Sequence, residues 1–367
     1  MRPRRILHVI TDLYVGGAET MLARLVTAKP GLADECAVVS LLPDGPVAGE
    51  LRAAGVPVVE LDLRNPFAAP GGLVRLARLI AETAPDIVQG WMYHGDLAAL
   101  LALALSGRRG STRLAWNIRC SRLDLAQYSR VLRLVVRACA ALSARPDLVL
   151  ANSKAGMDAH RALGYRPRRA EIVPNGIDVE RYRPDPAARA AIRGELGIAD
   201  GAIVLAHVAR LDPMKDHAGF LRAMAKLPDV QALMVGAGTE GLAAPGNVHR
   251  LGRRADIPRL LAAADFAVSS SAFGEGFSNA LAEGMACGLP PVATDVGDAS
   301  IIVGDTGLIV PPRDPDAFAR AVWALARESA EQRAARGARA RDHIVRNFSL
   351  AQARARFAEV YAGLLAR

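Results

Sequence analysis

Short apolar runs with the composition of buried strands alternate with helix-like segments along the whole chain, and this alternation most limits the fold. Strand-like runs such as Ile6–Ile10 and Ile203–Val208 are each followed by a helical pattern. Neighbouring parallel strands need a crossover connection, which is usually an α-helix. Both halves of the chain alternate in this way, although no internal sequence repeat relates them. The pattern predicts an α/β fold with parallel sheets.

The length of the chain indicates two domains. It has 367 residues, of which 51% are hydrophobic, enough apolar material for two cores. The four cysteines form no C-x-x-C pair and no metal-binding spacing, which fits a reducing cytoplasm. The apolar run Leu97–Leu105 is about half of the ~20 residues that a membrane span needs. His8 and Thr11 interrupt the apolar N-terminal stretch, which favours a strand over a signal peptide. We therefore expect a cytoplasmic protein.

The stretch Phe273–Pro291 combines a strand end, a glycine-rich loop and a short helix. It reads F-G-E-G-F-S-N-A-L-A-E-G-M-A-C-G-L-P-P and follows an apolar run that ends near Ser269. Ser278 is typical of a helix N-cap, and Asn279–Cys287 is predicted to be the helix. A glycine followed by prolines then ends it. The segment therefore reads as strand, loop and helix.

This arrangement suits the recognition of a phosphate. The start of a helix offers unpaired backbone N–H groups and the positive end of the helix dipole. Glu275 lies in the loop beside that position, and Glu283 lies about a turn and a half into the helix, at most ~12 Å away. Two carboxylates beside a diphosphate can each bind the hydroxyl groups of a sugar. The alternative is a pair of ordinary surface glutamates near a helix start.

Three further groups of residues follow predicted strands. Gly16 and Gly17 form a loop that lets the backbone approach a ligand closely, or merely a tight strand–helix turn. His94 lies just past the C-terminal end of a strand, where open α/β sheets bind ligands, although a lone histidine is often structural. Arg210 and Lys215 are two cations that suit a pyrophosphate, or simply a basic loop.

The segment Gly236–Gly241 reads G-A-G-T-E-G, a literal G-x-G-x-x-G. A nicotinamide site would need a long helix directly after these glycines. Pro245 and Gly246 interrupt the chain within a few residues. The motif is therefore interpreted as a glycine turn without a dinucleotide.

Taken together, these motifs resemble the retaining glycosyltransferases of family 4. That family carries E-G-F-x-x-x-x-x-E, then A-x-x-x-G-x-P and a T-D-x-G turn. This chain has Glu275 through Glu283, then Gly288-Leu-Pro290 and Thr294-Asp-Val-Gly297. The V-P-N-G-I-D string at 173–178 is a further family marker, and Arg210 and Lys215 match the family pattern G-R-x-x-x-x-K-G in their spacing.

The resemblance assigns roles to single residues. It implies that Glu275 holds the donor sugar, that Glu283 holds the ribose of the nucleotide, and that Arg210 and Lys215 stabilise the leaving diphosphate. His94 would contact the donor sugar, and backbone near Arg253 and Arg254 would meet the base. The predicted catalytic residues are thus His94, Arg210, Lys215 and Glu275, and the predicted donor-binding residues are Gly16, Gly17, Arg253, Arg254, Gly276, Phe277, Ser278, Asn279 and Glu283.

The chain departs from the family pattern at four positions. Gly284 stands where the family usually has alanine, which should weaken the helix by up to ~1 kcal/mol. Ala209 and Asp216 replace the usual glycines around the basic pair, and Pro291 stands where valine is common. None of these changes removes a chemical group that the family uses.

The implied fold is GT-B, with two Rossmann-like domains whose parallel sheets face each other across a cleft. The predicted domains are an acceptor-binding domain at 1–176 and a donor-binding domain at 177–349, with the C-terminal helix 350–367 packing back on the first. The resemblance implies sugar transfer from a nucleotide diphosphate sugar, with retention at the anomeric carbon. It implies no cofactor and no metal, and the sequence shows no D-x-D. No carboxylate stands out as a nucleophile for double displacement.

The net charge of +9 is concentrated in part in one segment. Between Arg108 and Arg137 there are eight arginines against one acid, Asp124. Leu125–Leu142 is predicted to be a helix with Arg130, Arg133 and Arg137 on one face. This face is either a solvated surface or a contact with an anionic membrane. Nucleic acid is not expected, because no binding motif or interleaved aromatic residues accompany the arginines.

The acceptor is predicted to be a saccharide or a lipid-linked saccharide of bacterial polysaccharide or glycolipid synthesis, which would place the protein in the cytoplasm or on the inner face of the membrane. Two other functions fit the same fold. A sugar-nucleotide epimerase would need catalytic carboxylates in the N-terminal half, where none is evident. A non-catalytic sugar-nucleotide-binding protein would not need to keep Glu275, Arg210 and Lys215 together.

Overall fold

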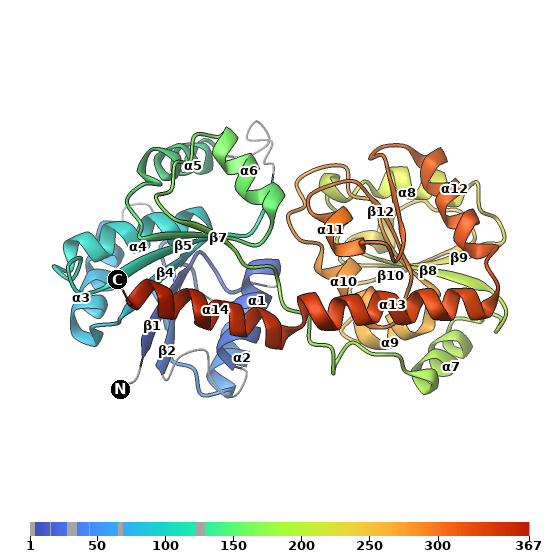
Figure 1. Cartoon of the computed structure of the whole chain (residues 1–367), viewed down its shortest axis with the longest axis horizontal. Coiled ribbons are helices and arrows are strands. Elements are labelled where there is room, and N and C mark those ends of the chain that lie inside the picture. Colours follow the sequence, from blue (N-terminus) through green and yellow to red (C-terminus); the bar gives the residue numbers. More distant parts are fainter. Residues whose placement is uncertain are drawn as a thin grey trace. The chain divides into compact units, whose positions relative to one another are not determined.

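The computed structural model describes residues 4–14, 16–27, 35–43, 45–64, 69–121 and 129–366. The chain forms two compact units (Figure 1). Unit 1 contains the residues up to Asn175 together with those from Ala353 onward, and unit 2 contains Gly176–Gln352. Each unit is built on its own parallel sheet, which confirms the predicted α/β fold with two Rossmann-like domains.

The sheet of unit 1 has seven parallel strands in the order β3-β2-β1-β4-β5-β6-β7. Their bounds are β1 Arg5–Ile10, β2 Glu35–Ser40, β3 Val58–Glu60, β4 Ile87–Trp91, β5 Arg113–Ile118, β6 Leu148–Ala151 and β7 Ala170–Ile172. The helices are α1 Gly17–Thr27, α2 Pro46–Ala53, α3 Ala69–Thr83, α4 Met92–Leu105, α5 Arg130–Leu142, α6 Lys154–Ala162 and α14 Leu350–Leu365. Helices α1, α2 and α14 bury their apolar sides against one face of the sheet, and α3 to α6 cover the other (Figure 1).

The sheet of unit 2 has six parallel strands in the order β10-β9-β8-β11-β12-β13. Their bounds are β8 Ile203–Val208, β9 Val230–Val235, β10 Val248–Gly252, β11 Phe266–Ser269, β12 Pro291–Thr294 and β13 Leu308–Val310. The helices are α7 Pro186–Glu195, α8 His217–Met224, α9 Ile257–Ala263, α10 Asn279–Ala286, α11 Ala299–Val303, α12 Pro315–Ala326 and α13 Ala330–Phe348, with short 3-10 turns at Pro213–Lys215 and Thr239–Gly241. Helices α8 and α12 pack on one face, and α7, α9, α10 and α13 pack on the other.

The strand order reverses once in each sheet, between β1 and β4 in unit 1 and between β8 and β11 in unit 2. Ligands of open α/β sheets bind outside the carboxyl ends of the strands at such a reversal. The predicted glycine pair follows β1 and His94 follows β4, while Arg210 and Lys215 follow β8 and Glu275 follows β11. The topology therefore puts the predicted residues of each unit at its own switch point.

An aspartate immediately before a strand fixes the opposite edge of both sheets. The Asp86 carboxylate accepts the backbone N–H of Arg5 at 2.9 Å. Asp147 accepts the N–H of Leu114 at 2.8 Å, and Asp265 accepts that of Val204 at 2.8 Å. Each aspartate thereby ties the start of its own strand to the start of the parallel neighbour.

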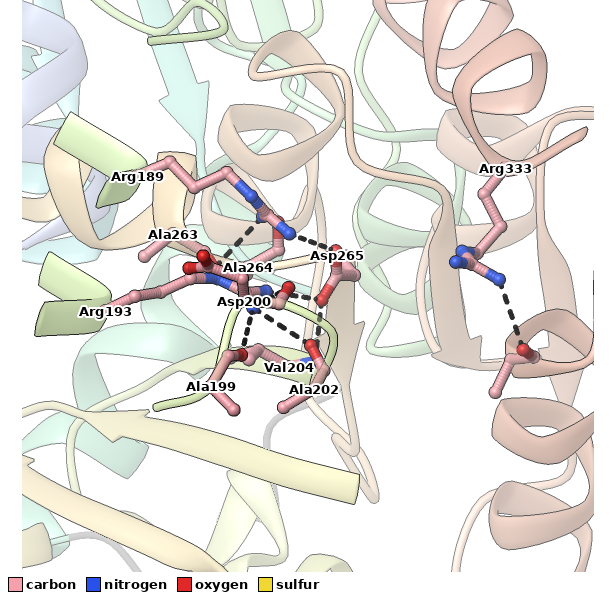
Figure 2. Close-up of polar contacts among 11 residues, drawn as sticks. Arg189, Arg193, Ala199, Asp200, Ala202, Val204, Ala263, Ala264, Asp265 and Arg333 are labelled. Atoms are coloured by element: carbon pink, nitrogen blue, oxygen red, sulfur yellow. Dashed lines mark hydrogen bonds and ion pairs between the residues drawn. The ribbon is translucent and has the colours of Figure 1, made fainter. Parts of the chain in front are cut away.

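In unit 2 this device is reinforced by a buried arginine (Figure 2). The Arg193 side chain on α7 is only 2% exposed and pairs with Asp265 at 2.8 Å. Its remaining donors bond four backbone carbonyls, those of Ala199, Asp200, Ala202 and Ala263, at 2.9 to 3.0 Å. Arg189, one turn earlier, pairs with the other oxygen of Asp265 at 2.7 Å. A buried guanidinium is tolerated here because a carboxylate balances its charge and each of its three nitrogens has an acceptor.

Several predicted elements have different limits in the structure. Helix α5 begins at Arg130 after an N-cap at Ser129, and residues 125–128 of the helix predicted there lie outside the described residues. His94 lies just past the end of β4, as the sequence predicted, and α4 begins at Met92 directly after that strand. Met92 adopts a left-handed φ of 60°, which turns the chain from strand to helix without a loop. The glycine segment after β9 leads to a 3-10 turn and then β10, so the long helix of a nicotinamide site is absent there, as predicted.

We expect Arg193→Met to lower the free energy of unfolding of unit 2 by about 3–5 kcal/mol, because it removes the buried guanidinium that balances the Asp265 charge and leaves several buried carbonyls without donors. Arg189→Met is the matched control: its side chain is 34% exposed, so a loss of about 1 kcal/mol is expected. Urea unfolding followed by circular dichroism measures both. Equal losses in the two variants would show that burial does not set the strength of this network.

Candidate active site

Two loops of unit 2 bring together a buried cation and a buried carboxylate. Lys215, after β8, forms an ion pair with Glu275, after β11, and their side chains are only 17% and 11% exposed. The Ser271 hydroxyl donates a second hydrogen bond to the same Glu275 oxygen at 3.1 Å. The sequence predicted both Lys215 and Glu275 as site residues, and the structure places them in direct contact.

Short polar contacts lock these two loops to each other. The backbone N–H of Ala272 donates to the carbonyl of Met214 at 2.8 Å. The Ser270 hydroxyl donates to the carbonyl of Lys215 at 2.7 Å. Thr294 on β12 donates to the carbonyl of Ser271 at 2.6 Å. The backbone around Lys215 and Glu275 is therefore held from three directions, which preorganises the pair.

Two buried histidines support the Lys215 loop from beneath. Because Ser270 uses its hydroxyl proton on the Lys215 carbonyl, its oxygen accepts from His207 Nε2–H at 2.9 Å. His217 Nε2–H donates to the carbonyl of Ala209 at 3.2 Å. Both histidines are then neutral, and their Nδ1 atoms are buried without a partner. They hold the two ends of the loop that carries Arg210 and Lys215.

Burial lowers the pKa of both histidines from the ordinary 6.5. For His207 the neighbouring His217 and the Lys215 ammonium lower the pKa further. For His217 the hydrogen bond to Ala209 and the carboxylates of Asp212 and Asp216 oppose the effect of burial, while Lys215 adds to it. Protonation of either ring therefore lowers the stability of the folded loop.

Arg210 lies at the edge of the same loop, with a partner of its own. Its guanidinium pairs with Asp212 at 2.8 Å, and the Arg210 side chain is 62% exposed. Asp212 also caps the following turn by accepting the N–H of Met214 at 2.9 Å. Arg210 and Lys215 are thus each held by a carboxylate, one at the surface and one buried.

The departure at Asp216 has a structural reason. Asp216 takes a left-handed φ of 45°, a conformation that glycine adopts without strain. Its side chain in return accepts the N–H of Gly219 at 2.9 Å and caps α8. The capping hydrogen bond offsets the strain of this backbone conformation, which the glycine that the family usually has there would adopt without strain.

Helix α10 begins where the sequence predicted, after Ser278, but the Ser278 side chain makes no capping hydrogen bond. Glu283 on this helix is buried, with 8% exposure. The Phe277 ring packs in the core against Phe348, so its contact with a ligand would come from the backbone. The carbonyl of Gly276 accepts the N–H of Asp298 at 3.0 Å, which joins the loop to the T-D-V-G turn.

Two glycines explain how tightly this segment is packed. A Cβ on Gly297 would lie 2.2 Å from the carbonyl oxygen of Glu275, and Gly297 has a left-handed φ of 66°. A Cβ on Gly284 would lie 2.4 Å from the Cβ of Ala267 on β11. The glycine at 284, where the family usually has alanine, therefore lets α10 approach the strand closely and compensates for its low helix propensity.

The pair Arg253 and Arg254 follows β10 at the same sheet edge. Arg253 is exposed. Arg254 is bound to Asp256 at 2.8 Å and to Glu195 at 3.2 Å, and these hydrogen bonds raise its pKa above the ordinary value. The Arg254 guanidinium is thus committed to two carboxylates, which agrees with a backbone rather than a side-chain role at this point.

In unit 1 the predicted residues lie at the β1/β4 reversal. Gly16 precedes α1, and Gly17 is its first residue. His94 lies in the first turn of α4, and burial lowers its pKa. None of these residues shares a unit with Lys215 and Glu275. Within the described ranges, no three or more His, Cys, Asp or Glu side chains are arranged to hold a metal ion.

Sequence reasoning missed several polar residues that the structure brings to these edges. Ser271 binds Glu275, and His207, His217 and Ser270 support the Lys215 loop. Arg119, directly after β5, is a further cation at the edge of unit 1. The available signal was position along the chain. His207 lies in β8, while Arg119, Ser270 and Ser271 lie within two residues of the end of β5 or β11. His217 is the first residue of α8, directly after the turn that carries Lys215.

The two neutral histidines predict a pH dependence of stability. Below about pH 6.5 the unfolded chain binds protons that folded unit 2 excludes. The free energy of unfolding therefore decreases as the pH is lowered, by up to ~1.4 kcal/mol per pH unit for each histidine. His207→Gln and His217→Gln should each flatten this slope between pH 7 and 5. Urea titrations at each pH measure it. Slopes that match the unsubstituted protein would rule out the two rings as its source.

Two family models match the chain in consecutive segments. The model described as Glycosyltransferase Family 4 matches residues 15–181, and the model described as Glycosyl transferases group 1 matches residues 202–328. Together they cover more than three quarters of the chain. The second segment contains Arg210, Lys215, Glu275 and Glu283.

Curated relatives are also named glycosyltransferases. D-inositol 3-phosphate glycosyltransferase 2 of Catenulispora acidiphila is 33% identical over 243 residues, which cover 59% of this chain and 56% of that protein. The D-inositol 3-phosphate glycosyltransferase of Geodermatophilus obscurus is 37% identical over 213 residues, 50% of this chain and 46% of that protein. The chain thus spans about half the length of these relatives.

Solved structures share the fold over nearly the whole chain. Anabaena HepE, solved in complex with UDP and glucose, has a TM-score of 0.84 and 25% identity, covering 98% of this chain and 100% of that one. Sucrose-phosphate synthase from Thermosynechococcus elongatus has a TM-score of 0.79 and 17% identity, covering 99% of each. The two-sheet architecture with these neighbours is the GT-B fold, and the chain belongs to the glycosyltransferases that the group 1 and family 4 models describe.

Proposed function

We propose that this protein transfers a sugar from a nucleotide diphosphate sugar to a saccharide or lipid-linked saccharide acceptor, with retention at the anomeric carbon. One observation carries the proposal: Lys215 and Glu275 form a largely shielded ion pair, 17% and 11% exposed, at the topological switch point of unit 2. This is where an α/β sheet binds its ligand, and the pair offers one group for a phosphate and one for sugar hydroxyls.

Binding of the donor would exchange partners within this pair. The diphosphate competes with Glu275 for the Lys215 ammonium, and the exposed Arg210 can turn from Asp212 toward the same phosphates. Glu275 is then released to accept hydrogen bonds from the donor sugar. Charge on the leaving diphosphate is greatest in the transition state, so the cations Lys215 and Arg210 beside it would lower the barrier. The backbone N–H groups at the start of α10 add to this.

The remaining contacts are proposed from the resemblance to family 4. Glu283 on α10 would bind the ribose, and backbone at Arg253 and Arg254 would meet the base. Gly16, Gly17 and His94 of unit 1 would contact the donor sugar. No metal is needed in this scheme, because Arg210 and Lys215 supply the positive charge. With no carboxylate assigned as a nucleophile, we propose that the acceptor attacks on the face that the diphosphate leaves.

The comparisons favour a particular donor to test first. Anabaena HepE was solved with UDP and with UDP-glucose, at 24% to 25% identity to this chain. The curated relatives are named for a phosphorylated acceptor, D-inositol 3-phosphate. We therefore propose a UDP-sugar donor, with a GDP-sugar second. A bacterial polysaccharide or glycolipid is the proposed product.

A basic and apolar face on unit 1 suits an acceptor held in a membrane. On α5, Val131 and Leu134 are 66% and 69% exposed, and the exposed Arg130 and Arg137 lie beside them. Arg133 is only half-buried on the same helix. Among the described residues, no helix is both long enough and apolar enough to cross a membrane. We propose that α5 lies on the anionic inner face of the cytoplasmic membrane, with its arginines at the headgroups.

A screen of nucleotide diphosphates and nucleotide sugars tests the donor. A ligand present at about a hundred times its dissociation constant should add ~2.7 kcal/mol of stability, seen as a rise in melting temperature. We expect a UDP- or GDP-sugar to do so in the presence of EDTA, and Lys215→Met and Glu283→Gln to abolish the effect. Lys226→Met is the control, because Lys226 is 52% exposed and pairs with Asp316 far from the loops in sequence. Stabilisation by NAD or NADP alone would contradict the proposal.

Vesicle flotation tests the membrane face. The protein should float with vesicles containing phosphatidylglycerol and not with pure phosphatidylcholine, and binding should fall as salt rises. Val131→Ser with Leu134→Ser should weaken binding by removing apolar contact, and Arg130→Gln with Arg137→Gln should weaken it by removing charge. Binding that survives both double substitutions would exclude α5 as the docking surface.

A further inference from the structure

Arg119 occupies a position at the sheet edge of unit 1 that the proposed contacts leave unused. It is the first residue after β5, the strand that pairs with β4 at the reversal of the sheet. Its guanidinium carbon lies 5.4 Å from the centroid of the Trp91 ring, and Trp91 is the last residue of β4. The Trp91 indole in turn donates to His8 Nδ1 at 3.1 Å. Arg119 is thus stacked on a fixed aromatic platform.

The polar partners of Arg119 are few and uncharged. One Nη donates to the side-chain oxygen of Asn175, and the other to that of Asn117 at 3.4 Å, a weak contact. The Nε–H group is buried and has no hydrogen-bond partner. A guanidinium carries five N–H donors, so this environment satisfies only part of them.

No carboxylate within the described ranges forms an ion pair with Arg119. The Tyr361 hydroxyl on α14 and the Glu19 carboxylate on α1 act on its charge electrostatically, without a direct ion pair. Burial lowers the pKa of Arg119 to about 9, which expresses how poorly its charge is compensated. A shielded cation without a counter-charge is costly, and proteins keep such groups where a ligand completes them.

The comparison with Arg193 makes the difference plain. Arg193 is fully buried, whereas Arg119 is partly buried, yet Arg193 pairs with Asp265 and carbonyl oxygens accept from its other two nitrogens. That set identifies an arginine whose role is structural. Arg119 has two amide oxygens in place of a carboxylate, and a bare Nε–H.

We propose that Arg119 is an anion-binding residue of unit 1 that takes a phosphate group of a substrate. A phosphate fits because its oxygens accept the parallel N–H bonds of a guanidinium fork and supply the missing negative charge. The position fits because the carboxyl edge of a parallel sheet is its ligand-binding edge. The inference rests on the proposed transfer reaction, whose substrates offer two sources of phosphate: the donor diphosphate and a phosphate carried by the acceptor.

The first experiment uses inorganic phosphate as the probe on the full-length protein. At constant ionic strength, replacing chloride by phosphate should raise the melting temperature of the unsubstituted protein. Arg119→Met should bind phosphate about tenfold more weakly or worse, because it loses charge-assisted hydrogen bonds. Arg119→Lys should lie between the two, since it keeps the charge without the planar fork. Arg168→Met, an exposed arginine of the same unit, should behave like the unsubstituted protein.

The melting temperature without phosphate separates a binding role from a structural one. Because no carboxylate among the described residues pairs with Arg119 and would lose its partner, Arg119→Met should keep or raise the melting temperature, unlike Arg193→Met. A fall as large as that of Arg193→Met would overturn the proposal, and so would phosphate binding by Arg119→Met equal to that of Arg168→Met.

Kinetics then distinguish the two sources of phosphate. If the donor supplies it, Arg119→Met weakens the binding of UDP and raises KM for the UDP-sugar. If the acceptor supplies it, Arg119→Met raises KM for the acceptor and leaves UDP binding unchanged. Unchanged values for both substrates would overturn the proposal. Failure of the proposed function is a separate result, because Lys215→Met and Glu283→Gln would then leave nucleotide-sugar binding intact.

Discussion

The bond between Asp265 and its arginines is the constraint on which unit 2 depends. One carboxylate joins α7, the start of β8 and the start of β11 by charge and by hydrogen bonds. Strands β8 and β11 flank the sheet reversal, and the loops at their far ends carry Lys215 and Glu275. Fixing the strands at one edge therefore sets the spacing of the two loops at the other. The precision of the site comes from the rigid strands, and the loop contacts only complete it.

Without a ligand, the charged side chains of the candidate site are paired with one another. Two ions needed for a charged substrate would be costly to keep shielded from water separately. By pairing, Lys215 and Glu275 compensate each other while no substrate is bound, and Arg210 does the same with Asp212 at the surface. In the proposed reaction the substrate has to displace these partners, so part of its binding energy goes into the rearrangement. Such exchange favours a ligand that satisfies both ions at once over a bare phosphate or a bare sugar.

Much of this could be predicted from sequence, because alternating strands and helices and the E-G-F motif are local signals. The parallel α/β fold, the start of α10 and the positions of Lys215 and Glu275 after strands follow from them. The sequence did not predict features that depend on contacts with a second segment of the chain or on an unusual backbone angle. The loop-free turn at Met92 depends on an uncommon backbone angle, and Gly284 is explained only by Ala267 on a neighbouring strand. The lack of a counter-ion at Arg119 likewise depends on which residues reach it across the sheet.

The aspartates that precede β4, β6 and β11 have a consequence for strand alignment. A parallel strand that slips by one residue turns every side chain to the opposite face, and an all-apolar strand has little to oppose the slip. A carboxylate placed one residue before the strand accepts the backbone N–H of one particular residue of the neighbouring strand. Each aspartate therefore fixes the register of its strand against the neighbouring strand. Because these aspartates all lie at the amino edge of the sheets, the loops at the carboxyl edge can change in length and sequence without disturbing the strand alignment.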